Sequence, residues 1–324
     1  MLWFIGLGIS GISELSDSTL SIIKNADIVY LESFTSPISE TEKDELKNIS
    51  NGEFKSAKRW LVEDGNEILE NAKKKVVVLI SYGDPYIATT HLELKTRAIR
   101  DNIETNTIHS SSIVSSLIGE VGLHYYKVGK ILTIMNDAKS MVTPYNTIFD
   151  NLLNHAHSVI LLEYNEDKSF FLAPENALLL LLDIEKNQNR KVISSETFGI
   201  VASRIGKSDQ KITSGKISNL IKNKFGEPPH SIIIPGSLHF TELDALKIVT
   251  KCLDEPFDNS ANLKSISEQM IEKYVPMVRD ALEEIKPHYE NIKEYEDVLI
   301  NAKLYIDDAE NFLKEGKKEY AVLS

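Results

Sequence analysis

The hydrophobic pattern of the chain changes from strand-like to helical within one stretch, VVVLISYGDPYIATTHLEL, at residues 76–94. An apolar run typical of a buried strand stops at Gly83, Asp84 and Pro85, and a helical pattern follows. Gly83 permits a sharp turn and Pro85 fixes the direction of the exit. Ligands of open parallel sheets bind beyond the carboxyl ends of the strands, so this turn is a candidate binding loop with Asp84 facing the ligand. Asp is also a common turn residue before Pro, and that structural alternative stays open.

Short apolar strands alternate with helical patterns on both sides of this stretch. The pattern predicts strands at 2–5, 27–33, 76–81 and 105–112, with helices at 17–25, 41–48, 64–74 and 88–101. Such alternation is typical of a parallel α/β domain. It resumes after residue 111 and continues to a helix that includes Leu246. We therefore expect an α/β fold with two tandem α/β domains, at residues 1–108 and 109–253.

The last part of the chain differs in composition and in the spacing of its apolar residues. After Asp254, β-branched runs become rare, and Glu, Lys, Tyr and Leu recur at helical spacing. Proline disrupts helix interiors, so Pro276 and Pro287 predict three segments, at 259–274, 277–286 and 288–314. Residues 254–324 are thus expected to form an all-helical appendage of unknown role.

Composition excludes several classes of protein. Among 324 residues, 48 acidic and 36 basic side chains give a net charge of −12, which argues against a nucleic-acid partner. Cys252 is the only cysteine, so no intrachain disulfide can form, and a reducing, cytoplasmic location is expected. No apolar run approaches the roughly 18 residues that a membrane helix needs, so we expect no membrane partner.

The first strand carries a glycine motif with a second possible meaning. Gly6, Gly8 and Gly11 match the dinucleotide-binding spacing, and Glu32 lies where a ribose-binding acid is expected. That motif needs its third glycine to open the helix. Here residues 12–15 intervene before the expected helix cap at Ser16 or Asp17. A nicotinamide-dependent oxidoreductase remains a less favoured alternative.

Six segments together resemble one known family. They are FIGLGISGISELS (4–16), ADIVYLESFTS (26–36), GDPYIATTHLELKTRA (83–98), IHSSSI (108–113), GLHYYKVGK (122–130) and FGEPPHSIIIPGSLH (225–239). This set resembles the diphthine synthases, which belong to the tetrapyrrole-methylase superfamily. The resemblance covers about residues 1–250. It implies S-adenosylmethionine as the methyl donor, bound in a cleft between the two α/β domains.

The same resemblance implies an acceptor and a partner. The acceptor would be the 3-amino-3-carboxypropyl group on a modified histidine of elongation factor 2, whose amine is methylated to give diphthine. A homodimer is also expected from the family alone. A corrinoid, another tetrapyrrole or an rRNA is the alternative acceptor within the superfamily.

The resemblance also implies a set of donor-binding residues. Ser112 has an alternative interpretation as a helix N-cap, and a lone histidine such as His230 is more often an ordinary surface or core residue. The apolar members offer backbone groups and an apolar wall suited to an adenine ring. The implied cofactor-binding residues are Ile9, Asp84, Ile87, Ser112, Ile113, Leu162, Ile205 and His230.

Methyl transfer from a sulfonium depends on positioning and desolvation more than on a strong acid or base. No residue is therefore identified as catalytic, and the group that takes the proton of the acceptor amine is unknown. No His and acidic residues stand at metal-ligand spacing, so no metal is expected. The aromatic pair in residues 122–126 is expected to pack in the core, and the leucines 178–182 in a domain or subunit interface.

Overall fold

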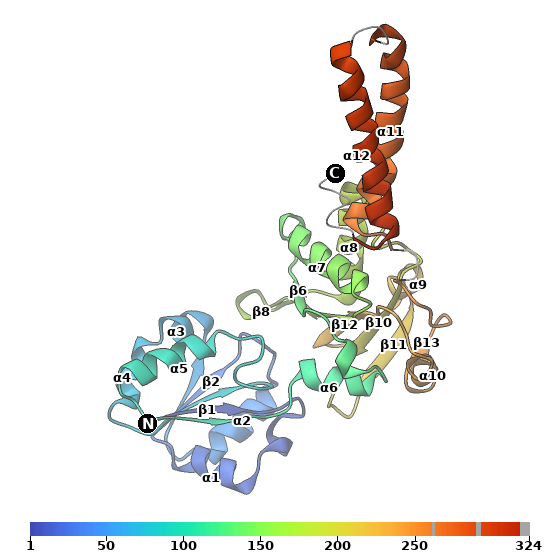
Figure 1. The fold of residues 1–324 in the computed structure, drawn as a ribbon. Helices are drawn as coiled ribbons and strands as arrows, with labels where there is room; N and C mark the ends of the chain where they lie inside the picture. The colour runs from blue at the N-terminus through green and yellow to red at the C-terminus, as the bar shows by residue number, and fades with distance from the viewer. Residues whose placement is uncertain (261–262, 290–292, 318–324) are drawn as a thin grey trace. The chain divides into compact units, whose positions relative to one another are not determined.

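The computed structural model describes residues 1–260, 263–289 and 293–317 (Figure 1). The chain forms two compact units, Met1–Ala261 and Asn262–Ser324, and each is described by itself. The described part of the first unit contains two large β-sheets, one two-stranded sheet and their helices, and that of the second is a pair of helices. None of the helices in the described ranges is both long and apolar enough to cross a bilayer.

The first sheet is entirely parallel, with the strand order β3-β2-β4-β1-β5. Its central strand β4 is the apolar run that precedes the Gly-Asp-Pro turn, and all five of its residues are buried. This arrangement confirms the predicted parallel α/β domain. The strands are β1 (Leu2–Gly6), β2 (Ile28–Glu32), β3 (Glu53–Ala57), β4 (Val77–Ser81) and β5 (Thr105–Ile108).

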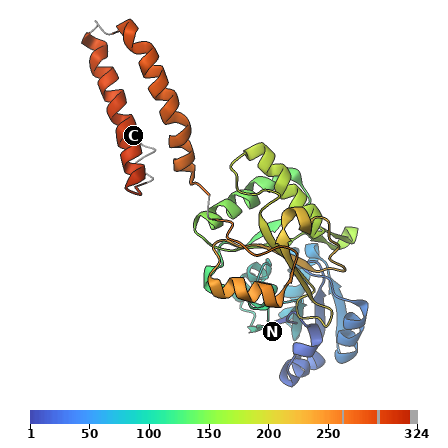
Figure 2. The same cartoon turned by 90° about the vertical axis from the view of Figure 1, so that its right-hand side faces the viewer.

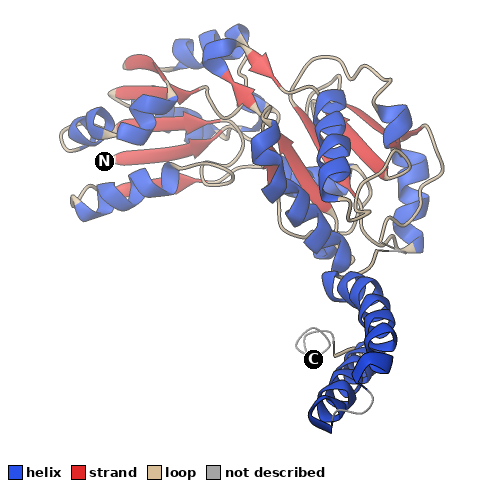
Figure 3. Cartoon of the chain, turned by 90° about the horizontal axis from the view of Figure 1, so that it is seen from above, coloured by secondary structure: helices blue, strands red, loops and turns tan. Residues whose placement is uncertain are grey.

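Helices cover both faces of this sheet (Figure 3). Successive strand residues point to opposite faces, so Phe4 and Leu79 enter one core cluster while Ile5 and Ile80 enter the other. Burial on both faces explains why these strands are continuous apolar runs. The helical segments are η1 (Gly11–Glu14), α1 (Asp17–Asn25), α2 (Glu40–Ile49), α3 (Arg59–Asp64), α4 (Asn66–Ala72) and α5 (His91–Arg100).

The second sheet is mixed, with the order β13-β11-β10-β12-β7-β6. Strand β10 runs antiparallel to both β11 and β12, and β12 runs antiparallel to β7. The carboxyl end of β7 therefore lies beside the amino end of β12. The strands are β6 (Leu132–Ile134), β7 (Ser158–Leu162), β10 (Phe198–Ser203), β11 (Lys211–Lys216), β12 (His230–Ile234) and β13 (Lys251–Cys252).

The helices and small elements of this second domain complete the predicted α/β class. A two-stranded hairpin, β8 (Tyr164–Asn165) with β9 (Phe170–Phe171), follows β7 and stands apart from the main sheet. The helical segments are α6 (Ile113–Glu120), η2 (Tyr125–Lys127), η3 (Ala138–Met141), α7 (Val142–Leu153), η4 (Glu166–Lys168), α8 (Pro174–Gln188), α9 (Ile217–Leu220) and α10 (Phe240–Val249).

The second unit is a hairpin of α11 (Ile266–Tyr289) and α12 (Lys293–Lys314), which run side by side in two views (Figures 1 and 2). The predicted breaks were wrong, because both Pro276 and Pro287 lie inside α11. Each proline removes one backbone donor and crowds the preceding turn, but neither ends the helix. Both prolines lie on exposed positions of α11.

Contacts between the two helices stabilise the hairpin despite the prolines. Val275 of α11 is buried, as are Ile306 and Ala309 of α12. The Arg279 guanidinium lies 2.9 Å from a carboxylate oxygen of Asp307. Cross-helix packing of this kind supplies most helix stability in proteins, so it can offset a local proline cost.

One expectation about apolar side chains needs correction, and a second stays a prediction. Tyr126 is 100% exposed and Tyr125 is 56% exposed, so the aromatic pair does not pack in the core. The pair lies on the short helix η2 rather than entering a strand, and this helix turns both rings outward. In the leucine run on α8, Leu178 and Leu181 are buried within the chain, while Leu179 is 44% exposed. The run thus has one face buried within the chain, and its place in a domain or subunit interface stays a prediction.

Candidate functional site

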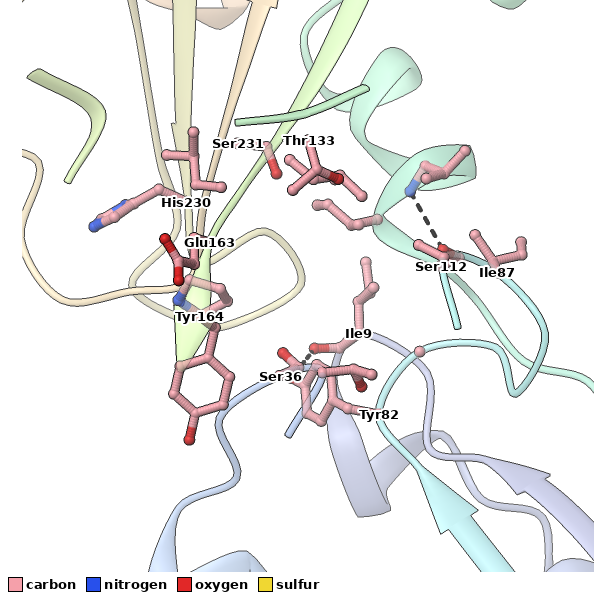
Figure 4. A pocket seen from close by; sticks show the side chains of 18 of the residues that line it. Ile9, Ser36, Tyr82, Ile87, Ser112, Thr133, Glu163, Tyr164, His230 and Ser231 are labelled. Carbon is pink, nitrogen blue, oxygen red and sulfur yellow. Dashed lines mark hydrogen bonds between the residues drawn. The ribbon is translucent and has the colours of Figure 1, made fainter. Parts of the chain in front are cut away.

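A cavity of about 270 Å³ lies where the strand-end loops of the two sheets meet. Its walls come from the loops after β1, β2 and β4, from the start of α6, and from the ends of β6, β7, β10 and β12. Side chains from both domains line it (Figure 4). It brings together all eight residues that the sequence singled out: Ile9, Asp84, Ile87, Ser112, Ile113, Leu162, Ile205 and His230.

The Gly-Asp-Pro turn is fixed by its own aspartate. Gly83 has a φ of +70°, a conformation that favours glycine. Asp84 accepts a hydrogen bond of 2.9 Å from the Tyr86 backbone N–H, and its other oxygen lies 2.7 Å from His109 Nδ1. Asp84 therefore does stabilise the turn, as the alternative to a binding role requires. Asp84 also lines the cavity, and a carboxylate has enough lone pairs to serve both roles.

The loop that carries Ile9 is joined to that turn. Gly8 and Gly83 exchange two backbone hydrogen bonds, of 3.2 and 3.0 Å. The Tyr82 hydroxyl donates to the Ile9 carbonyl oxygen at 2.5 Å, and the Ile9 N–H donates to Ser111 Oγ at 2.9 Å. Burial raises the pKa of Tyr82, so this hydroxyl keeps its proton and remains a donor. These bonds hold the side chain of Ile9 against the cavity.

The glycine motif does not form a dinucleotide site. Gly11 opens only the short helix η1, and α1 begins after the cap Ser16, whose side chain accepts from the Thr19 N–H. A Cβ added at Gly8 would collide with the Glu14 carboxylate. That negative charge lies where a pyrophosphate would have to approach. The structure thus disfavours the nicotinamide alternative by geometry and by charge.

Ser112 acts as a helix N-cap, which is the alternative role that its sequence context allows. It is the N-cap of α6, and its hydroxyl accepts from the Val114 N–H at 3.3 Å. Ser112 also lines the cavity beside Ile113 (Figure 4). Together with Ile9 and Ile205, Ile113 gives this part of the cavity an apolar surface. Such a surface with a few polar groups at its edge fits a nucleoside that carries a sulfonium.

The imidazole of His230 is bonded within the sheet. Its Nδ1 lies 2.9 Å from Ser203 Oγ on the neighbouring strand β10. Figure 4 shows the ring directed away from Ile9 and Tyr82. Burial lowers the pKa of His230, which favours the neutral ring near pH 7.

Sequence reasoning missed several polar residues of the cavity. Glu163 directly follows β7, and the same strand-end rule that selected Asp84 could have found it. Arg59 is the first residue of α3, and no pattern in the sequence marked it. Further missed polar lining residues are Thr35, Ser36, Tyr82, Thr133, Tyr164 and Ser231.

A smaller cavity, of about 50 Å³, adjoins the first and shares Glu163 and Tyr164 with it. The β8–β9 hairpin supplies Phe171 to its wall. None of the described residues form a cluster of three or more His, Cys, Asp or Glu side chains that could hold a metal ion.

The comparisons with known proteins agree with this geometry. The profile of the family described as Tetrapyrrole (Corrin/Porphyrin) Methylases matches residues 1–221. The diphthine synthase of Methanococcus maripaludis strain C5 is 37% identical over 250 residues, which are 76% of this chain and 98% of that protein. The diphthine synthase of Methanocaldococcus jannaschii is 35% identical over 252 residues, again 76% and 98%. A solved diphthine synthase superposes with a TM-score of 0.69 at 29% identity, covering 78% of this chain and 96% of that one.

The chain belongs to the tetrapyrrole methylases, as its paired α/β domains and the cavity between their strand ends indicate. Within that class it belongs to the diphthine synthase family and is an S-adenosylmethionine-dependent methyltransferase of diphthamide biosynthesis. About a quarter of the chain has no counterpart in the two methanogen proteins. The family profile ends at residue 221, so α11 and α12 lie beyond the part of the chain that it matches.

Proposed function

We propose that the chain methylates the amine of the 3-amino-3-carboxypropyl group on a modified histidine of elongation factor 2 and so produces diphthine. The proposal rests on membership of the diphthine synthase family and on one structural observation. All eight expected donor-binding residues line the same cavity, although they are scattered along the sequence from Ile9 to His230. Convergence of distant segments on one cavity is typical of a ligand site.

The residues of the chain would hold the donor and exclude water. S-adenosylmethionine supplies an electrophilic methyl group bound to a positively charged sulfur. Ile9, Ile113 and Ile205 would cover its nucleoside, and Leu162 offers backbone groups at the end of β7. Asp84 offers a carboxylate to hydroxyl or ammonium donors. Positioning and desolvation of this kind are what an in-line methyl displacement requires.

The direct experiment supplies elongation factor 2 that carries the unmethylated 3-amino-3-carboxypropyl histidine, together with methyl-labelled donor. We expect label in the factor, and mass spectrometry should place it on the modified histidine. Factor with an unmodified histidine is the matched control and should stay unlabelled. Label in a corrinoid or in rRNA, with none in the factor, would transfer the assignment to another acceptor of the superfamily.

The same proposal includes a cytoplasmic reaction and a homodimeric enzyme. A lone cysteine, Cys252, and an acceptor on a translation factor support the location. The dimer rests on the family alone. Light scattering coupled to size-exclusion chromatography should give twice the 36.5 kDa of one chain, and a mass of one chain would contradict the dimer.

A further inference from the structure

Three charged side chains, Arg59, Asp84 and Glu163, and the imidazole of His230 line the cavity among the residues that the structure describes. Asp84 is already bonded to Tyr86 and His109, and the ring of His230 is bonded to Ser203. Arg59 and Glu163 therefore remain as one cation and one anion with hydrogen-bonding capacity to spare. They come from different domains, Arg59 from the first and Glu163 from the second.

Glu163 is held by its backbone and leaves part of its carboxylate free. Its N–H donates to the Ile134 carbonyl at 3.0 Å, and its carbonyl accepts from the Leu172 N–H at 2.9 Å. Its Oε2 accepts from the Asn136 N–H at 2.7 Å. A carboxylate can accept about four hydrogen bonds, so Glu163 retains the ability to bind an ammonium group.

Arg59 is likewise positioned but not saturated. Its guanidinium lies 4.8 Å from the centre of the Phe34 ring, and only Nη1 approaches the Glu63 carboxylate, at 3.3 Å. A guanidinium has five N–H donors arranged as a fork that matches a carboxylate. Arg59 can therefore receive a carboxylate from a ligand without losing either of these contacts.

Two bonds tie the walls that carry these residues. Ser33 Oγ donates to Glu166 Oε1 at 2.5 Å, three residues beyond Glu163. Lys58 Nζ, from the residue before Arg59, lies 2.9 Å from Asp167 Oδ1. The first contact joins the β8–β9 hairpin to the loop after β2, and the second joins it to the residue before Arg59. Arg59 and Glu163 both line the cavity that these walls enclose.

We infer that Arg59 and Glu163 form the acceptor-recognition pair, in which Arg59 binds the carboxylate of the acceptor and Glu163 binds its ammonium and takes its proton. The inference rests on the proposed function, whose acceptor carries these two groups on one carbon. Neither residue is among the eight expected donor-binding positions. Opposite charges on opposite walls also set the orientation of the acceptor, because the reverse orientation would place like charges together.

The proton balance of the step is simple. The acceptor ammonium gives one proton to Glu163, which frees the nitrogen lone pair. The nitrogen then forms a bond to the methyl carbon while the carbon–sulfur bond breaks and its electron pair stays on sulfur. Each further methylation of the same nitrogen again requires loss of a proton, which Glu163 passes to solvent between turnovers.

For Arg59, the test compares Arg59→Gln and Arg59→Lys with wild type in the labelling assay. We expect Arg59→Gln to raise the KM for the acceptor at least tenfold, and Arg59→Lys to recover part of that loss as a point charge without the fork. The affinity of modified elongation factor 2 for the enzyme saturated with S-adenosylhomocysteine should fall in parallel. Arg100→Gln, at an exposed position of α5, is the matched control.

For Glu163, we expect Glu163→Gln to lower kcat about 100-fold at pH 7, the lower end of the range for loss of a general base. Its rate should then rise about tenfold per pH unit toward the pKa of the amine, because only free amine reacts. Wild type should show a shallower dependence, and Glu163→Asp should recover part of the rate. Glu45→Gln, exposed on α2, is the matched control.

The remaining measurements separate the possible failures. Affinity for S-adenosylhomocysteine and thermal unfolding should be unchanged in Arg59→Gln and Glu163→Gln. Suppose that wild type labels the factor. If Arg59→Gln and Glu163→Gln then label it as fast as wild type does, or if their losses of activity are explained by weaker donor binding, the recognition pair is wrong and the proposed function stands. If wild type binds the donor but labels no modified factor, the proposed function fails and this inference fails with it.

Discussion

Lys207 Nζ lies 2.8 Å from Glu42 Oε1, and this ion pair joins the second domain to the first near Tyr82, which lines the cavity. Only about a fifth of each side chain is exposed, at 21% and 22%. Burial alone would raise the pKa of Glu42, but the bonds from Lys207 and Ser39 lower it. The Lys207 ammonium also lies 5.2 Å from the centre of the Tyr82 ring, whose hydroxyl holds Ile9.

Replacing Lys207 by Met should weaken donor binding. The change leaves Glu42 without its cation and removes the ammonium above Tyr82, so the Ile9 loop loses support. A partly buried ion pair of this kind contributes roughly 1 kcal/mol to the support of the Ile9 loop. If binding of the donor loses that free energy, its affinity falls about fivefold. Calorimetry with S-adenosylhomocysteine measures it. Lys224→Met, at an exposed position, should bind like wild type, and equal affinities in both variants would rule out the supporting role.

Asp84→Ala should weaken donor binding at least tenfold, because it removes a lining carboxylate and releases the turn from Tyr86 and His109. Asp84→Asn keeps an acceptor for the Tyr86 N–H and should retain more of the stability than of the affinity. Urea unfolding and calorimetry on the same samples separate the two effects. Unchanged donor affinity in Asp84→Ala would remove Asp84 from the site.

Gly206→Ala tests how closely the second domain approaches Ile9. A Cβ at Gly206 would come within 2.7 Å of Ile9 Cγ1, at a φ of +84°. Gly226 offers a control, because its φ is +80° but no atom lies within 4 Å of the added Cβ. Both variants should lose roughly 1 kcal/mol of stability from backbone strain. Only Gly206→Ala should also lose donor affinity, and equal affinity losses would refute the contact.

The contribution of Glu242 to the stability of the first unit should be lost as the pH falls below 4.5. Burial would raise the pKa of Glu242, but bonds from Lys127, His239, His124 and His157 lower it to about 2. Because the folded value is depressed, the stabilisation is complete above the unfolded value near 4.5 and is lost as the pH falls toward 2. The contribution of the ionised Glu242 to the free energy of unfolding is on the order of 3 kcal/mol.

Glu242→Gln should therefore unfold at lower urea concentration than wild type at pH 7, and the difference should shrink between pH 4.5 and about 2. Paired urea titrations at pH 7, 4 and 3 measure it. A difference that stays constant over this range would show that the charge of Glu242 does not contribute. Glu227→Gln, close in sequence and exposed, controls for the general loss of one carboxylate.

Removal of residues 262–324 should leave donor affinity unchanged, because no described residue of α11 or α12 lines the cavity. The truncated chain keeps Asn259, whose side chain bonds the backbone of Phe198 and Pro235. It also keeps Ser260, which bonds His155. A weaker complex with S-adenosylhomocysteine, measured by calorimetry, would assign the hairpin a part in donor binding.

Apolar strands and turn chemistry were sufficient to predict most of the fold. Strand β4 was recognisable because a strand that is buried on both faces is apolar throughout. The turn was recognisable because Gly83 adopts a positive φ, which favours glycine. Strands β3 and β11 were missed, since exposed residues such as Glu53 and Lys211 interrupt their apolar pattern. Their pairing is set by neighbouring strands rather than by their own sequence.

The candidate site was predicted unevenly for similar reasons. Residues on strand-end loops, such as Asp84, follow from a rule about parallel sheets. Arg59 lies on a short helix, and its place beside Phe34 depends on tertiary packing that no local pattern encodes. The exposure of Tyr126 was mispredicted because composition favours burial of aromatic rings, whereas only the backbone direction of η2 decides it.

The distribution of the cavity walls along the chain has a consequence for synthesis. Lining residues extend from Ile9 to Ser231, and the antiparallel strand β12 places the last of them between β7 and β10. A nascent chain on the ribosome therefore completes the walls of this cavity only after β12 has been translated. A fragment that ends before β12 lacks His230 and Ser231, and so it lacks part of the cavity wall.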